Sequence, residues 1–386
     1  VQQQLNLNKE ARLNYNYLIK IESNLKAMIN LYNIDIIEAK YKEALDTINK
    51  ILQIKEIDNV HRDKAFVFYK LNRIKESKEI CIFYLKKNPK DLVSLNIIGQ
   101  CFFHEGKYNE SVKIFDKILE IDPKNLSALN SLGRTYHEKR EAIKAEKYYL
   151  RALEINKLSF YVLNNIAGFY REELNYEKAI NYYEQALSIN PNNPYIYNNL
   201  SKIYFDLKNH KEAKKNSFKA IEMKGDDGDI QKTLSFIYLK DHDFEKGWNY
   251  FEGRLDLDDF IKKNDYVQKL NNKLYRLNII KNKKNKFLIV REQGVGDEIL
   301  YSSMYEEVLE ELENVMIECD PRLLNLFKRS FPKYKNNFVE LGNITNNETK
   351  FQDIDYVLYA GSLGRYYRKN INNFHKKSFI KIDNKN

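Results

Sequence analysis

The feature that most constrains this chain is a pattern that recurs every 34 residues through its middle. Each copy holds two apolar residues three positions apart, then a small residue, then an aromatic residue three positions later. A second small residue follows twelve positions after the first, and prolines recur where one copy gives way to the next. The clearest copies begin at Leu95, Leu129, Leu163 and Tyr197. This spacing predicts helices that bury one face and cross closely at the small residues.

The pattern resembles the tetratricopeptide (TPR) repeat, in which each unit is a pair of antiparallel helices. The resemblance implies a mostly helical fold, with a TPR α-solenoid of about six to seven units over residues 25–257. Residues 1–24 are predicted to form a leading helix or a disordered segment. Stacked repeats build an extended concave surface. The first functional prediction is therefore a protein or peptide partner held in the TPR groove.

One position of the repeat carries asparagine in all four clear copies, directly after the leading apolar residue. Asparagine both donates and accepts hydrogen bonds, so a ladder of asparagines can hold a peptide backbone without reading its side chains. Basic and aromatic residues follow at helical spacing. The alternative is that the asparagines follow a biased composition and bond within their own helices. The predicted groove residues are Asn96, Asn130, Asn164, Asn198, Arg134, His137, Arg171 and Lys202.

The pattern changes kind after residue 257. Residues 258–285 are charged and rich in asparagine, with a helical apolar stripe that predicts a connecting helix. Over residues 286–386, short apolar runs alternate with helical patterns, which is typical of a parallel α/β sheet. The predicted fold of this segment is a partial Rossmann-like domain. The runs that predict strands are Phe287–Val290, Val315–Ile317, Phe338–Leu341 and Ile354–Leu358.

The sharpest local motif is the Gly294-Val295-Gly296-Asp297 loop that follows the first predicted strand. Ligands bind beyond the carboxyl ends of strands in open α/β sheets, and glycines let the backbone approach a ligand. Asp297 is predicted either to cap the following helix or to accept a proton from a substrate hydroxyl. Dinucleotide binding is disfavoured, because Ile299 stands where a third glycine is needed. The acidic Asp297 and Glu298 would also repel a pyrophosphate.

A TPR array followed by a Glu-Gln-Gly-x-Gly-Asp loop resembles bacterial TPR proteins with a C-terminal glycosyltransferase-like domain. These proteins are akin to heptosyltransferases and, more distantly, to O-linked N-acetylglucosamine transferases. Further matching segments are Gly247–Glu252, Pro321–Leu324 and Arg329–Pro332. The resemblance implies the N-terminal half of a GT-B fold, with Asp297 as general base. The implied substrate-binding loop is Gln293, Gly294, Val295 and Gly296.

The resemblance therefore predicts part of a TPR-coupled glycosyltransferase whose solenoid binds a protein acceptor. The alternative is a non-catalytic TPR adaptor in which the α/β segment only caps the array. Family members hold a nucleotide-sugar donor in a second domain, and the residues up to 386 leave no room for one. We accordingly expect no cofactor bound by this chain, and no sugar transfer by a chain that ends there.

Composition narrows the remaining classes. The formal net charge of +10 is spread along the chain, which favours a solvated surface over a nucleic-acid site. Three scattered cysteines predict neither disulfides nor a metal site, and they fit a cytoplasmic location. No apolar run approaches the roughly 18 residues that suggest a membrane span.

Overall fold

The computed structural model describes residues 2–22, 24–263, 267, 283–292, 294–340, 353–374 and 378–381. The chain divides into two compact units, Val1–Asn190 and Pro191–Asn386. Most of the predicted connecting helix and Gln293 of the predicted loop lie outside the described residues. We call the first unit 1 and the second unit 2.

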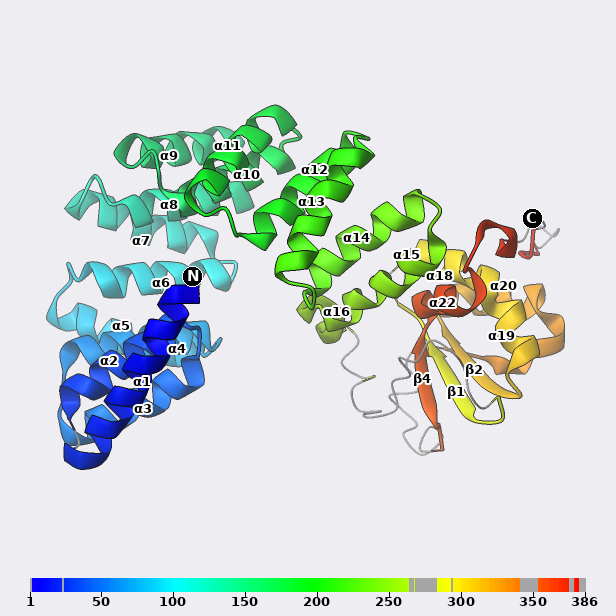
Figure 1. Cartoon of the computed structure of the whole chain (residues 1–386), viewed down its shortest axis with the longest axis horizontal. Coiled ribbons are helices and arrows are strands. Elements are labelled where there is room, and N and C mark those ends of the chain that lie inside the picture. The colour runs from blue at the N-terminus through cyan, green and yellow to red at the C-terminus, as the bar shows by residue number, and fades with distance from the viewer. Residues whose placement is uncertain are drawn as a thin grey trace. The chain divides into compact units, whose positions relative to one another are not determined.

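Unit 1 is built from a leading helix and successive helix pairs, drawn from blue to green in Figure 1. The two helices of a pair pack on each other, and the first helices of neighbouring pairs, such as α6 and α8, are also in contact. Their bounds are α1 Gln2–Glu22, α2 Leu25–Ile37, α3 Tyr41–Ile54, α4 Asp58–Lys70, α5 Ile74–Lys87, α6 Leu92–His104, α7 Tyr108–Ile121, α8 Leu126–Glu138, α9 Ala142–Ile155, α10 Phe160–Glu172 and α11 Tyr176–Ile189.

The small residues of the repeat lie where the two helices of a pair cross, as the pattern predicts. A Cβ atom built on Gly133 of α8 would lie 2.6 Å from the ring of Tyr149 on α9. At the preceding crossing, the Ser111 hydroxyl donates to the carbonyl oxygen of Gly99 at 3.0 Å. The aromatic ring of the second helix thus fills the space that a larger side chain on the first helix would need.

The turn inside each pair places one residue in the left-handed region. Gly106, Arg140 and Leu174 stand 34 residues apart and have φ values of 72°, 60° and 57°. At the second of these turns, the Arg140 N–H donates to the His137 carbonyl and the Glu141 N–H to that of Tyr136, each at 2.9 Å. These bonds satisfy the last carbonyl groups of the first helix. Only one of the three residues is glycine, so hydrogen bonding defines this turn more than residue type does.

Unit 2 contains two further helix pairs followed by a small sheet with its covering helices. Its helical elements are α12 Pro194–Asp206, α13 His210–Met223, α14 Gly228–Lys240, α15 Phe244–Phe251, η1 Glu252–Asp256, α16 Asp258–Lys263, α18 Val295–Tyr301, η2 Ser302–Met304, α19 Tyr305–Glu311, α20 Pro321–Ser330, η3 Pro332–Asn337, η5 Ala360–Leu363, α22 Gly364–Tyr367 and η6 Ile371–Asn373. Its strands are β1 Lys286–Val290, β2 Asn314–Cys319, β3 Phe338–Glu340 and β4 Tyr356–Tyr359.

The four strands pair in parallel in the order β3-β2-β1-β4, which places β1 and β2 at the centre. Phe287 and Ile289 of β1 face a core shared with α18, α19 and α20. Leu288 and Val290 face the opposite core, to which Leu255 of η1 contributes. Burial on both faces explains why β1 is continuously apolar. The four predicted strands are confirmed, although the last begins at Tyr356 and Leu341 of the third lies outside the described residues.

Gly133→Ala should destabilise unit 1, because the new methyl group would overlap the Tyr149 ring. Overpacking of this kind costs about 1–3 kcal/mol. Gly168→Ala is the matched control, since the nearest atom to its new methyl group is the Tyr183 hydroxyl at 3.7 Å. There helix propensity should dominate and stabilise the protein by about 0.5–1 kcal/mol. Urea unfolding followed by circular dichroism measures both changes, and two effects of the same sign would contradict the close crossing.

Candidate functional site

The predicted asparagine ladder joins neighbouring repeats within unit 1. The side-chain oxygen of Asn96 accepts a hydrogen bond from the Ser127 hydroxyl at 3.3 Å. That of Asn130 accepts from the side-chain amide of Asn165 at 3.0 Å. Both bonds run from the first helix of one pair to the first helix of the next, and not within one helix as the alternative predicted. Asn164 is half-buried and makes no side-chain hydrogen bond within the described part of the chain.

Arg134 is the most available cation at the predicted groove positions of unit 1. Its guanidinium lies over the Phe103 ring, 4.7 Å from the centroid. It forms no ion pair with any carboxylate among the residues that the structure describes. His137 differs, since its Nε2 lies 3.2 Å from a carboxylate oxygen of Glu172. Arg171 is half-buried on α10.

The predicted groove residues of unit 2 are engaged by a carboxylate of the next repeat. Asn198 is 1% exposed, and its amide donates to Asp229 Oδ2 at 2.7 Å. Lys202 Nζ donates to the same oxygen at 2.6 Å. Asp229 stands at the start of α14, one repeat further on. These contacts join α12 to α14, so Asn198 could reach a ligand only if it left Asp229.

The loop after β1 starts α18 in a different register from the predicted one. Gly294 is the N-cap residue and the helix begins at Val295, so Asp297 is the third residue of the helix and not its cap. Asp297 Oδ2 accepts the backbone N–H of Gly294 at 3.2 Å. Gly296 is exposed, and a Cβ atom built there would meet nothing within 4 Å. Among the described residues, the space beside the backbone is therefore open at Gly296, the residue before Asp297.

The buried carboxylate of Glu298 connects the start of α18 to the segment that follows β2. Glu298 is 0% exposed, and its Oε1 accepts the backbone N–H of Asp320 at 2.8 Å. Its Oε2 lies 3.6 Å from Arg291 Nε, and Arg291 also donates to Asp320 at 2.7 Å. Burial raises the pKa of Glu298. Hydrogen bonds from Arg322 hold the pKa of Asp320 well below its usual range. The sequence interpretation used Glu298 only as a charge against pyrophosphate and missed this role.

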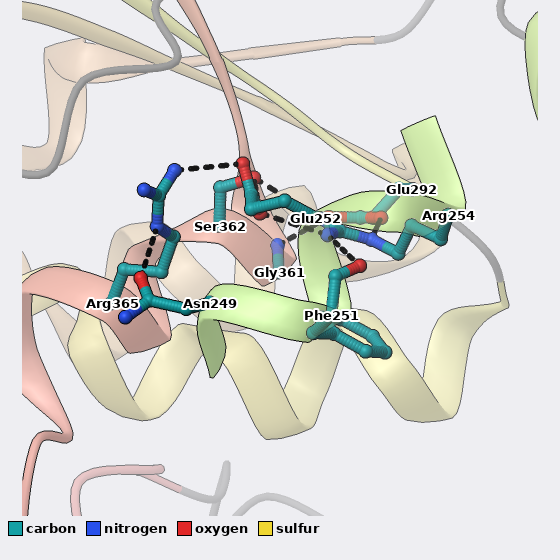
Figure 2. Close-up of polar contacts among 8 residues, drawn as sticks. All are labelled: Asn249, Phe251, Glu252, Arg254, Glu292, Gly361, Ser362 and Arg365. Atoms are coloured by element: carbon teal, nitrogen blue, oxygen red, sulfur yellow. Dashed lines mark hydrogen bonds and ion pairs between the residues drawn. The ribbon is translucent and has the colours of Figure 1, made fainter. Parts of the chain in front are cut away.

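A second polar network, shown in Figure 2, joins the end of the helix pairs to two strand ends. Arg254 of η1 and Glu292 after β1 are 1% and 2% exposed. The guanidinium donates to both carboxylate oxygens, with Nε–Oε2 and Nη2–Oε1 distances of 2.8 Å. Glu292 Oε1 also accepts the backbone N–H of Gly361, in η5 directly after β4. Arg254 further donates to Glu252 and Ser362.

The outer residues of this network connect α15 to α22 and to the residue that follows it. Arg365 donates to Asn249 and to Glu252, each at 3.2 Å. The Trp248 indole N–H donates to the carbonyl oxygen of Arg368 at 3.0 Å. A Cβ atom built on Gly364 would lie 2.3 Å from the Trp248 ring, so only glycine fits there. The segment Gly247–Glu252, one of those that carry the glycosyltransferase resemblance, is thus a packing surface, and its sequence was the one signal that could have led to Arg254.

Comparison with known proteins supports the repeats. Residues 90–157 and 194–227 match the family described as tetratricopeptide repeat, and residues 169–208 match the one described as TPR repeat. The chain therefore contains tetratricopeptide repeats. No curated protein sequence matches it. Among the described helices, none combines the length and apolar character that a bilayer crossing requires.

Several solved structures are similar to this chain. Yeast Tom70 superposes with a TM-score of 0.52 and 19% identity, over 68% of this chain and 57% of Tom70. A tetratricopeptide repeat protein from Parabacteroides merdae has a TM-score of 0.48 and 14% identity, over 62% of this chain and 96% of its own. A thermophilic TPR protein from Thermus thermophilus has a TM-score of 0.43 and 19% identity, over 47% of this chain and 100% of its own. At 19% identity, the likeness to Tom70 shows the fold alone.

Glu298→Gln should make the protein less sensitive to rising pH. Because the folded pKa of Glu298 is raised, the folded state holds this proton more tightly than the unfolded state. The wild type therefore loses stability as pH rises from about 4.3, the unfolded value, through the folded pKa. Urea unfolding should show a larger stability advantage for the variant at pH 7 than at pH 4.5. The exposed Glu306→Gln is the control, and an equal advantage at both pH values would count against a raised pKa.

Proposed function

We propose that this protein binds an extended segment of a partner protein along the first helices of its solenoid. Tetratricopeptide arrays present such helices on a concave binding surface. The observation that carries the proposal is Arg134, a guanidinium stacked on Phe103 without a carboxylate partner in the described part of the chain. Stacking holds the planar guanidinium in place, so it loses little freedom when it donates to a ligand.

The neighbouring asparagines fit the same role. Among the described residues, the side chains of Asn96 and Asn130 form hydrogen bonds through their oxygens alone, which leaves their amide N–H groups as donors. Asn164, one repeat beyond Asn130, has its whole side-chain amide available within the described residues. The partner that suits this row of donors is an extended chain that offers backbone carbonyl groups, with a carboxylate or carbonyl oxygen at Arg134.

Arg134→Met should weaken capture of the partner while the fold stays intact. Loss of a hydrogen bond from a charged group costs about 1.5–3 kcal/mol, which corresponds to roughly ten- to hundredfold in affinity. The matched control is Arg151→Met, because Arg151 also lies over an aromatic ring, at 5.8 Å from Tyr148, but on the second helix α9.

Affinity capture from the source cell, quantified by mass spectrometry, compares the two variants with the wild type. The expected partners are proteins whose capture falls with Arg134→Met and is unchanged with Arg151→Met. If both variants retain the same proteins as the wild type, the first-helix surface around Arg134 is not the binding site.

A second candidate function is that the α/β part forms the acceptor side of a sugar-transfer site. The order β3-β2-β1-β4 is also that of the first four strands of a doubly wound, Rossmann-like sheet, which supports this candidate. Ligands of such sheets bind where the strand order reverses, which here lies between β1 and β4. The loop with Asp297 follows β1 at this place, and Asp297 would accept the proton of an acceptor hydroxyl while a nucleotide sugar served as donor. Free, buried cysteines accord with our proposal of a cytoplasmic site for this reaction.

Asp297→Asn should keep the fold and abolish the base. The amide oxygen of Asn can still accept the Gly294 N–H, so the melting temperature should stay within a few degrees of the wild type. Turnover should fall by about 10²–10⁴-fold. The measurement is nucleotide release from a panel of nucleotide sugars, with protein purified from its own source. A variant that keeps full turnover would leave Asp297 with a purely structural role.

A further inference from the structure

We infer that Arg254 is a positioning residue, which holds the loop that carries Asp297 through its buried pair with Glu292. The last helix pair of the solenoid would then control the geometry of that loop. The meaning of Asp297 in this inference rests on the proposed sugar-transfer function. The connection of Arg254 to the loop through Glu292 is independent of that function, and it can be tested without a transfer reaction.

The geometry of the pair is specific. Both guanidinium contacts to Glu292 are 2.8 Å long, and the guanidinium also stacks on Phe251 at 4.2 Å from the ring centroid. Paired, parallel hydrogen bonds between a guanidinium and a carboxylate fix orientation as well as distance. Glu292 stands two residues before Gly294, the N-cap of α18. Its side chain is therefore anchored next to the start of the loop.

Glu292 also fixes the loop relative to β4. Its Oε1 accepts the N–H of Gly361, so one carboxylate joins η1, the end of β1 and the end of β4 (Figure 2). A Cβ atom at position 361 would lie 2.5 Å from Glu292 Oε1 and 3.0 Å from Arg254 Nη2. Glycine at this position is what lets the backbone reach the carboxylate. The two strand ends on either side of the β1–β4 boundary thus share one acceptor.

η1 also packs against α14, the first helix of the last pair, so a shift of η1 would displace α14. A Cβ atom at Gly228, the first residue of α14, would lie 2.3 Å from the carbonyl oxygen of Gly253, so α14 and η1 are in backbone contact next to Arg254. Asp229, the next residue of α14, holds Asn198 and Lys202 of the predicted groove. A continuous series of contacts therefore runs from these groove residues through Arg254 to the loop.

This arrangement favours two states over gradual movement. A buried charge that loses its partner is strongly destabilised, so the pair is either formed or broken. A ligand that changed the position of α14 would change the fraction of molecules in which the pair is formed and Glu292 holds the loop. The link would make occupancy of the solenoid end and the conformation of the Asp297 loop depend on each other.

Hydrogen–deuterium exchange of the whole chain tests the link. Arg254→Met removes the guanidinium and keeps an unbranched apolar side chain against Phe251. We expect exchange in residues 294–301 and 360–364 to become about tenfold faster, a change of about 1.4 kcal/mol in local opening. Exchange in residues 315–330, across β2 and α20, should stay as in the wild type. The control Lys246→Met, on the exposed side of α15, should change neither region.

Unchanged exchange at the loop in Arg254→Met, or an equal rise across residues 315–330, would overturn the inference, because the second outcome reports general destabilisation. If Arg254→Met fails to fold, Glu292→Gln serves instead, since it keeps the shape and the acceptor for Gly361. It should speed exchange at the same two regions by a smaller factor, and a wild-type pattern would equally overturn the link. The double variant should exchange no faster than Arg254→Met, because the pair acts as one unit, whereas multiplied effects would show two independent residues.

Discussion

The solenoid depends on the closeness with which two helices cross inside each repeat. At that crossing, one helix presents a residue no larger than alanine or serine. The ring of Phe115 fills the remaining space at Gly99 and that of Tyr149 at Gly133, whereas the Ser217 hydroxyl meets Ser201 between α12 and α13. The first helices of neighbouring pairs, such as α6 and α8, are also in contact. The row of donors around Arg134 is a consequence of this packing, because it needs first helices that lie side by side.

Unit 2 is joined by polar contacts of a different kind. Apolar packing at the crossings tolerates exchange between similar shapes, whereas a paired guanidinium and carboxylate permit one orientation. The structure uses the second device where its helix pairs meet the sheet, at Arg254 and Glu292. Buried ion pairs contribute little net stability compared with apolar residues of the same volume. We infer that the pair serves here to define the geometry at the ends of β1 and β4.

Features that are local or periodic could be predicted from the sequence. The 34-residue spacing of small and aromatic residues predicted the crossings, and the apolar run at Phe287–Val290 predicted a buried central strand. The partners of the asparagines could not be predicted, because they depend on residues that differ from copy to copy, such as Asp229 beside Asn198. The start of α18 was displaced, since a glycine N-cap has no side-chain signal. Arg254 and Glu292 are separated by 38 residues and share no periodicity, so only the folded structure brings them together.

The same network has a consequence for the order in which the chain matures. Repeats complete themselves from neighbouring segments, so unit 1 can assemble pair by pair as it emerges during synthesis. Arg254 must wait, because its contact with Ser362 spans 108 residues. Until that later segment is made, the Arg254 side chain lacks its complete set of buried partners. The surface of α15 and η1 that packs against the later segment remains exposed to water. At about 5–20 residues per second, synthesis of those 108 residues takes about 5–20 seconds, in which a chaperone or a second nascent chain has access to the unfinished end of the solenoid.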